Sequence, residues 1–332
     1  MKKVINNTII TLALPVGMFL LMMILTRIKG ITFYGNSQMW RTVLNNLSLS
    51  IPVALGIGMQ LRCGRMDFSG GITMILSGFI GVLVAQRFDN NPLIMIAVSI
   101  ACGLILSMIT ASVYTIAKLP IIICTVALTP FYESITMIVG GGQGVNIIGN
   151  ASLNIFGRMP VAIIILITAV CIYHFVTTYT VMAKQSKLLK NGQSIAVSIG
   201  IKEKRNVYIA YTFSGIIFGL AGVVYAAQNA IETQSNLSTA SVLFSYIVPV
   251  FIGFFLGNYS IEVIGIFMGS ITIQFMNYGL NTMGYGQGGW DNILFGIFMM
   301  SLWIITVKID SFKKLFTPKR KLNNASNIGT DI

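Results

Sequence analysis

Apolar residues form long runs, separated by short polar stretches, along almost the whole chain. A helix that rises about 1.5 Å per residue needs about 20 residues to cross the roughly 30 Å of hydrocarbon in a bilayer, and the runs have this length. The chain has ten of them, centred on residues 14–26, 49–61, 72–85, 95–116, 121–139, 161–176, 207–227, 242–256, 261–275 and 293–307. The pattern predicts an all-α membrane protein, a polytopic helical bundle of about ten transmembrane helices.

Composition supports lipid as the solvent for most of the chain. Of 332 residues, 55% are hydrophobic and only 9% are charged, whereas a soluble domain has about 25% charged residues. Neither a Pro/Ser-rich linker nor a charged insert divides the sequence, so we expect a single transmembrane domain over residues 1–332, with a cytoplasmic loop at 180–206 and a basic tail at 308–332. Prolines inside the spans, Pro52 above all, favour some broken helices.

The basic residues predict the orientation of the chain. With ten spans and a cytoplasmic N-terminus, 17 of the 22 Lys and Arg residues fall in inner segments. This asymmetry follows the positive-inside rule and places both termini in the cytoplasm. It also accounts for the net charge of +13 without a nucleic-acid partner.

Sulfur and imidazole groups give no sign of a metal site or a disulfide framework. The four cysteines, Cys63, Cys102, Cys124 and Cys171, lie singly in or beside apolar runs, without the paired spacing of zinc ligands. The one histidine, His174, is expected to be an interfacial residue, with a proton relay as the alternative.

Known catalytic motifs are missing from the sequence. There is no GxxxxGK[ST] loop to cradle a triphosphate, and neither HExxH nor GxSxG occurs. We therefore expect no enzymatic activity and no bound cofactor. A transport function needs instead a few polar groups at membrane depth, each of which must offset the cost of leaving water.

Three sets of polar residues could line a substrate pathway. The first is Gln60 with Asp67, which could contact solute, cap the third span, or form an ion pair with Arg62 or Arg65. The other two sets lie in the fifth span and around the last outer loop. Their members are Tyr132 and Glu133, and then Asn277, Tyr278, Asn281 and Trp290.

The loop at 180–206 contains a short amphipathic segment. Ile195, Ile199 and Lys202 share one helical face, with Ala196 and Gly200 beside it. Such a helix could lie on lipid headgroups or dock into a soluble motor protein, and the residues alone leave both alternatives open.

Several short motifs, in order and spacing, resemble the ribose/galactose-type permeases of ABC importers over residues 42–310. The central one is Gly64 to Gly71, where Arg65-Met66 replaces the family's Gly-Ile before the acidic Asp67. The others are Asn45-Asn46, Ala117-Lys118-Leu119-Pro120, Asn191-Gly192 with Gly200-Ile201, and Trp290-Asp291-Asn292-Ile293.

The resemblance implies the permease subunit of an importer for a sugar or sugar-like solute. It implies a separate ABC ATPase that uses ATP, an extracytoplasmic solute-binding protein, and a second permease chain, identical or related, in the bacterial plasma (inner) membrane. It also assigns ATPase coupling to the segment holding Gln193, Ile195, Ala196, Ile199 and Gly200, and adds Asn45 and Asn46 to the pathway. The alternative is a stand-alone secondary transporter or channel for a small polar solute, coupled to ions through Glu133, His174 or Asp291.

Overall fold

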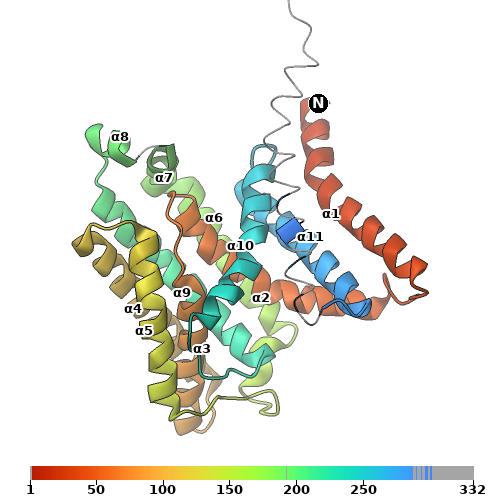
Figure 1. Cartoon of the computed structure of the whole chain (residues 1–332), viewed down its shortest axis with the longest axis horizontal. Coiled ribbons are helices and arrows are strands. Elements are labelled where there is room, and N and C mark those ends of the chain that lie inside the picture. Colours follow the sequence, from red (N-terminus) through yellow and green to blue (C-terminus); the bar gives the residue numbers. More distant parts are fainter. Residues whose placement is uncertain are drawn as a thin grey trace, which may run out of the picture. The chain divides into compact units, whose positions relative to one another are not determined.

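The computed structural model describes residues 2–191 and 193–286, together with Gly289, Ile293, Gly296, Ile297 and Met300. Contacts divide the chain into a unit that ends at Met283 and a second that begins at Gly284, and all contacts below belong to the first unit. Its helices are α1 (Lys2–Ile28), α2 (Ser37–Leu61), α3 (Gly70–Arg87), α4 (Pro92–Ala117), α5 (Ile121–Gly140), η1 (Asn154–Gly157), α6 (Val161–Tyr179), α7 (Val181–Asn191), α8 (Gln193–Ser198), α9 (Glu203–Gln228), α10 (Ser238–Leu256) and α11 (Glu262–Thr282) (Figure 1).

The predicted all-α membrane architecture is confirmed. Among the described residues, nine helices are long and apolar enough to cross a bilayer. Each contains the residues on which one predicted run is centred, except that Ile261 lies just before α11. The tenth run, 293–307, falls largely outside the described residues. The only β pairing in the described part is an isolated bridge between Val145 and Ile231.

Proline does not break the helices where it occurs. Pro52 lies inside α2, and that helix continues from Ser37 to Leu61, so the discontinuity expected around Pro52 was wrong. Pro130 and Pro249 likewise lie inside continuous helices, α5 and α10. In a bundle, neighbouring helices can satisfy the backbone groups that a proline leaves free.

Small residues bring the central helices together. Helix α9 packs on α3 and α4, and a methyl group added at Gly215 or Gly219 would meet the backbone of α4 at Gly103 or Ile100. Helices α10 and α11 meet in the same way through Gly253 and Gly265. In lipid, close packing of this kind takes the place of the hydrophobic effect as the force that holds helices together.

The connections gather at two ends of the unit. One end carries α7, α8 and the connections at 62–69, 118–120 and 257–261, and we call it the α7 end. The long connection at 141–160 lies at the opposite end (Figure 1), where Val145 pairs with Ile231 of the α9–α10 connection. The basic residues predict that the α7 end faces the cytoplasm.

Candidate functional site

The connection between α2 and α3, residues 62–69, is a hub of polar contacts at the α7 end, and we call it the α2–α3 turn. It forms because α2 ends at Leu61, with the N–H of Arg62 donating to the Gly58 carbonyl oxygen, and because Gly64 takes a left-handed conformation with φ of 75°. Glycine adopts this conformation without the steric cost of a Cβ atom. The turn thereby points two arginines, Arg62 and Arg65, back into the protein.

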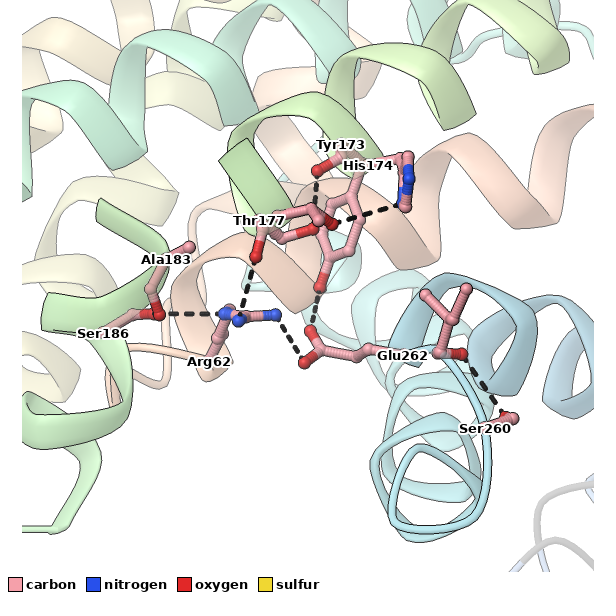
Figure 2. Close-up of polar contacts among 10 residues, drawn as sticks. Arg62, Tyr173, His174, Thr177, Ala183, Ser186, Ser260 and Glu262 are labelled. Carbon is pink, nitrogen blue, oxygen red and sulfur yellow. Dashed lines mark hydrogen bonds and ion pairs between the residues drawn. The ribbon is translucent and has the colours of Figure 1, made fainter. Parts of the chain in front are cut away.

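Arg62 joins four helices at a buried junction. Its guanidinium donates to the Glu262 carboxylate of α11 at 2.5 Å, to the Ser186 hydroxyl of α7 at 3.0 Å and to the Thr177 carbonyl oxygen of α6 at 3.1 Å. The Tyr173 hydroxyl of α6 also donates to Glu262, at 2.6 Å (Figure 2). All three guanidinium nitrogens of Arg62 are therefore used, as a buried charge requires.

Arg65 points to the other side of the turn, toward α9. Its guanidinium donates to Asn206 Oδ1 at 2.6 Å, and Asn206 is fully buried in the first turn of α9. Nearby, Gln60 Nε2 donates to the Ser214 hydroxyl of α9 at 3.0 Å. Arg65 Nε, Asn206 Nδ2 and Gln60 Oε1 are buried without a hydrogen-bond partner in the described structure, so this side has unused hydrogen-bonding capacity.

Asp67 caps the backbone ahead of α3. Its Oδ1 accepts hydrogen bonds from the backbone N–H and the hydroxyl of Ser69, both at 2.7 Å. Of the alternatives for Asp67, the ion pair with Arg62 or Arg65 was wrong, because these arginines bond Glu262 and Asn206 instead. Burial raises the pKa of the Asp67 carboxyl, and the Ser69 hydrogen bonds and the charge of Arg65 oppose this shift only in part.

A chain of hydroxyl groups leads from Asp67 to Tyr132. The Ser69 hydroxyl, which donates to Asp67, lies 3.5 Å from the Thr110 hydroxyl of α4, and that hydroxyl lies 3.1 Å from the Tyr132 hydroxyl of α5. The Phe68 N–H also donates to Thr125 Oγ1 of α5 at 3.1 Å. The structure therefore links Asp67 and Tyr132, two residues that the sequence placed in separate sets.

Glu133 lies beside Tyr132 in α5, but its carboxylate binds the start of α10. The Glu133 side chain is almost fully buried, and its carboxylate accepts hydrogen bonds from the Leu237 N–H at 2.8 Å and the Thr239 N–H at 3.0 Å. Both donors lie at the start of α10, which has no cap from its own sequence. A carboxylate suits this place because it meets the free N–H groups and the positive end of the helix dipole.

The other predicted pathway residues are spread over α2 and α11. Asn45 of α2 is partly buried and its carbonyl oxygen accepts from Gln228 Nε2 at 3.0 Å, whereas Asn46 is exposed. Near the end of α11, Asn277 is partly buried and Asn281 is exposed. The ring of Tyr278 lies 6.0 Å from the ring of Tyr34. Trp290 lies outside the described residues.

The loop at 180–206 forms two helices, α7 and α8, and the proposed coupling segment begins with α8. Ala196 is 1% exposed, whereas Ile195 and Ile199 are 67% and 64% exposed, so the segment turns apolar side chains outward. Helix α8 ends at Ser198, and Gly200 adopts a φ of 92° in the turn that follows. The first residue of α8 is Gln193.

Four residues of the junctions were not identified from sequence. Glu262, Ser186, Tyr173 and Asn206 are between 89 and 200 positions distant in the chain from the residues that they contact. One signal existed for Glu262, because the chain has only nine Asp and Glu residues. An acidic residue at the end of a span needs a basic partner, and the arginines at the α7 end supply one.

Comparison with known proteins assigns the family. The sequence profile of the family described as "Branched-chain amino acid transport system / permease component" matches residues 40–303. The chain is 20% identical over 250 residues to the ribose import permease protein RbsC of Escherichia coli K12, covering 73% of this chain and 77% of that protein. It is 24% identical over 285 residues to the fructose import permease protein FrcC of Rhizobium meliloti, covering 81% and 77%.

A third relative is the xylose/arabinose import permease protein XylH of Sulfolobus acidocaldarius. The identity is 22% over 278 residues, which cover 79% of this chain and 76% of the relative. No solved structure matches the chain. Since the family profile covers well over half of the sequence, the chain belongs to this family of transport permeases, and it is a multi-pass membrane protein.

Proposed function

We propose that this chain is the permease subunit of an ABC importer in the bacterial plasma membrane, which moves a sugar or sugar-like solute inward with energy from a separate ATPase. The observation that carries the proposal is the similarity, over about three quarters of each chain, to import permeases that are named for ribose, fructose and xylose or arabinose. The absence of a triphosphate-binding loop from the sequence agrees with ATP hydrolysis on another subunit.

The state of the charged groups favours a neutral solute over an amino acid, although the family description names amino acids. Glu133 is engaged by the start of α10, and Asp67 by Ser69. The guanidinium groups of Arg62 and Arg65 are bound to Glu262 and Asn206. A zwitterionic solute needs charged partners at membrane depth, and each of these four groups already has a partner within the protein, although Arg65 keeps one unused N–H.

The partners follow from the same proposal. The exposed Ile195 and Ile199 at the α7 end offer an apolar surface to the ATPase, and buried Ala196 holds α8 in place. An extracytoplasmic binding protein delivers the solute at the opposite end, and a second permease chain completes the pore. The chain itself binds no cofactor and catalyses no reaction.

Affinity purification of the tagged chain from its native membrane, in mild detergent, tests the proposal. We expect mass spectrometry to find an ATPase with a GxxxxGK[ST] loop and a solute-binding protein. Repeated recovery of this chain alone, together with uptake driven by an ion gradient, would contradict the proposal and favour a secondary transporter.

A further inference from the structure

The α2–α3 turn contacts the two helices that flank α7 and α8. The segment α7–α8 is preceded by α6 and followed by α9. Arg62 donates to the Thr177 carbonyl oxygen in the last turn of α6, and Arg65 donates to Asn206 in the first turn of α9. Two arginines that are only three positions apart therefore bind the end of the helix before α7–α8 and the start of the helix after it.

The turn also contacts α7 directly. Arg62 donates to the Ser186 hydroxyl, which in turn donates to the Ala183 carbonyl oxygen within α7. A Cβ atom added at Gly64 would lie 3.3 Å from the Lys190 Cα, so the two backbones are in close contact. A displacement of α7 must therefore move the turn or break these contacts, because closely packed backbones are nearly incompressible and transmit strain.

The same turn is tied to the membrane spans. Its ends continue into α2 and α3, and through Glu262 it holds the start of α11. Phe68 and Ser69 connect it to α5 and α4 through Thr125 and Thr110. The turn is the one described connection for which hydrogen bonds reach α4, α5, α6, α7, α9 and α11.

The two arginine contacts differ in strength. Arg62 makes three hydrogen bonds at the wall of an open cavity of about 390 Å³, whose lining includes Thr178, Lys184 and Gly257. Arg65 makes a single hydrogen bond, and Arg65 Nε and Asn206 Nδ2 have no partner in the described structure. The Arg62 contact is suited to transmit force, because several charge-assisted hydrogen bonds must break together. The Arg65 contact can exchange its partner at the loss of a single hydrogen bond.

We propose that Arg62 and Arg65 are positioning residues that transmit the movement of α7 and α8 to the spans. The α2–α3 turn is then the element through which the ATPase acts on the pore, which rests on the proposed function. When ATP binding displaces α7 and α8, Arg62 carries the α2–α3 turn with them and thereby moves α2, α3 and the start of α11. Arg65 guides the turn along α9.

The reactivity of a native thiol can report a movement of the α2–α3 turn. Cys63 lies between the two arginines and is buried. We would purify the complex of this chain with its ATPase after replacing Cys102, Cys124 and Cys171 by serine, and measure the rate at which N-ethylmaleimide labels Cys63. The rate is compared without nucleotide and after trapping with ATP and vanadate.

With Arg62 and Arg65 intact, trapping should change the labelling rate by about threefold or more, since coupling along such networks has that magnitude. Ser186→Ala removes the one hydrogen bond from Arg62 to α7, and Asn206→Ala removes the hydrogen bond of Arg65 to α9. Both should reduce the change, Ser186→Ala more strongly. Arg62→Gln should abolish it. ATPase binding and basal ATP hydrolysis should stay within about twofold of the parent complex in each variant, because the contacts removed lie inside the permease.

Arg205→Gln is the matched control, because Arg205 is exposed on α9 next to Asn206 and its loss removes the same charge from the same end. It should leave the nucleotide-dependent change intact. An unchanged Cys63 rate on trapping, in a complex that hydrolyses ATP, would overturn the inference, as would a normal change in both alanine variants. Failure to recover any ATPase would instead contradict the proposed function. If the Arg62→Gln protein does not accumulate in the membrane, the labelling rates of Ser186→Ala and Asn206→Ala test the inference.

Discussion

Glu133 of α5 caps α10 by binding Thr239: one carboxylate oxygen accepts hydrogen bonds from both the backbone N–H, at 3.0 Å, and the hydroxyl, at 2.8 Å. Leu237, just before α10, has a φ of 60° and donates its N–H to the other carboxylate oxygen. A side chain 106 positions away in the sequence thus does what an N-cap residue usually does within its own helix.

Replacing Glu133 by alanine should destabilise the protein. The loss of the cap leaves N–H groups at the start of α10 without an acceptor, which costs about 1–2 kcal/mol, with a further cost for the cavity. Glu133→Gln keeps one acceptor oxygen and should cost less. Thermal unfolding in detergent measures both, with the exposed Ser134→Ala as the control. Equal midpoints for Glu133→Ala and Ser134→Ala would contradict the capping role.

Close packing between α4 and α9 predicts strong sensitivity at Gly215. A side chain at this position would collide with the Gly103 carbonyl oxygen and with Ser107. We expect Gly215→Leu to destabilise the protein by about 3 kcal/mol or more, since overpacking against backbone cannot be relieved by a rotamer change. Gly17→Leu, where nothing lies within 4 Å, is the control. The monodisperse fraction in size-exclusion chromatography should fall only for Gly215→Leu.

Arg62 and Glu262 should be strongly coupled in a double-mutant cycle. Glu262→Gln leaves the buried Arg62 guanidinium without its carboxylate partner and should cost about 3–5 kcal/mol. Arg62→Gln leaves the Glu262 carboxylate, which is partly exposed, and should cost less. The double variant should cost clearly less than the sum of the two. Reversible unfolding in mixed micelles gives the three free energies. Additive effects would show that the two residues do not act as a pair.

Helix positions could be predicted from the sequence, because crossing a bilayer imposes a length and an apolar composition on each span. Helix ends were less predictable. Helix α2 begins at Ser37, twelve residues before its apolar centre at 49–61, because polar residues such as Asn45 and Asn46 continue the helix. Residues of this kind lower the hydropathy of the first half of α2, although the helix continues through them.

Long-range partners could not be predicted from a single sequence. An ion pair with Arg62 or Arg65 was one of three alternatives for Asp67, because they are neighbours in the chain, yet Arg62 binds Glu262, 200 positions away. The short distance from Asp67 to Ser69 explains the difference, since a carboxylate binds a backbone N–H two residues ahead without any movement of the turn. Which arginine of the α7 end meets which carboxylate depends on helix packing, which hydropathy does not encode.

The raised pKa of Asp67 predicts a dependence of stability on pH. A carboxyl group whose pKa is higher in the folded than in the unfolded chain stabilises the fold when protonated, and this contribution is lost as the pH rises from about 3.8 through its folded value. Asp67→Asn keeps the acceptor for the Ser69 N–H without the charge. It should therefore raise the unfolding midpoint at pH 7, with a gain that shrinks toward pH 4.

Unfolding midpoints between pH 4 and 8 test this expectation. Glu232→Gln, at an exposed carboxylate of the α9–α10 connection, serves as the control and should leave the profile unchanged. A variant Asp67→Asn that is less stable than the parent at pH 7 would show that the charge is needed in the folded protein.

The central claim is that this chain imports solute only through a separate ATPase that docks on α8. Its most direct test is uptake of labelled ribose, fructose and xylose by proteoliposomes that contain the chain with its binding protein, with and without the ATPase and ATP. We predict uptake of at least one sugar only when the ATPase and ATP are present. The double variant Ile195→Glu/Ile199→Glu, at the exposed apolar residues, should lose about 90% of this uptake, since charges in an apolar interface cost several kcal/mol. Uptake by the chain without the ATPase, or full uptake in the variant, would contradict the account.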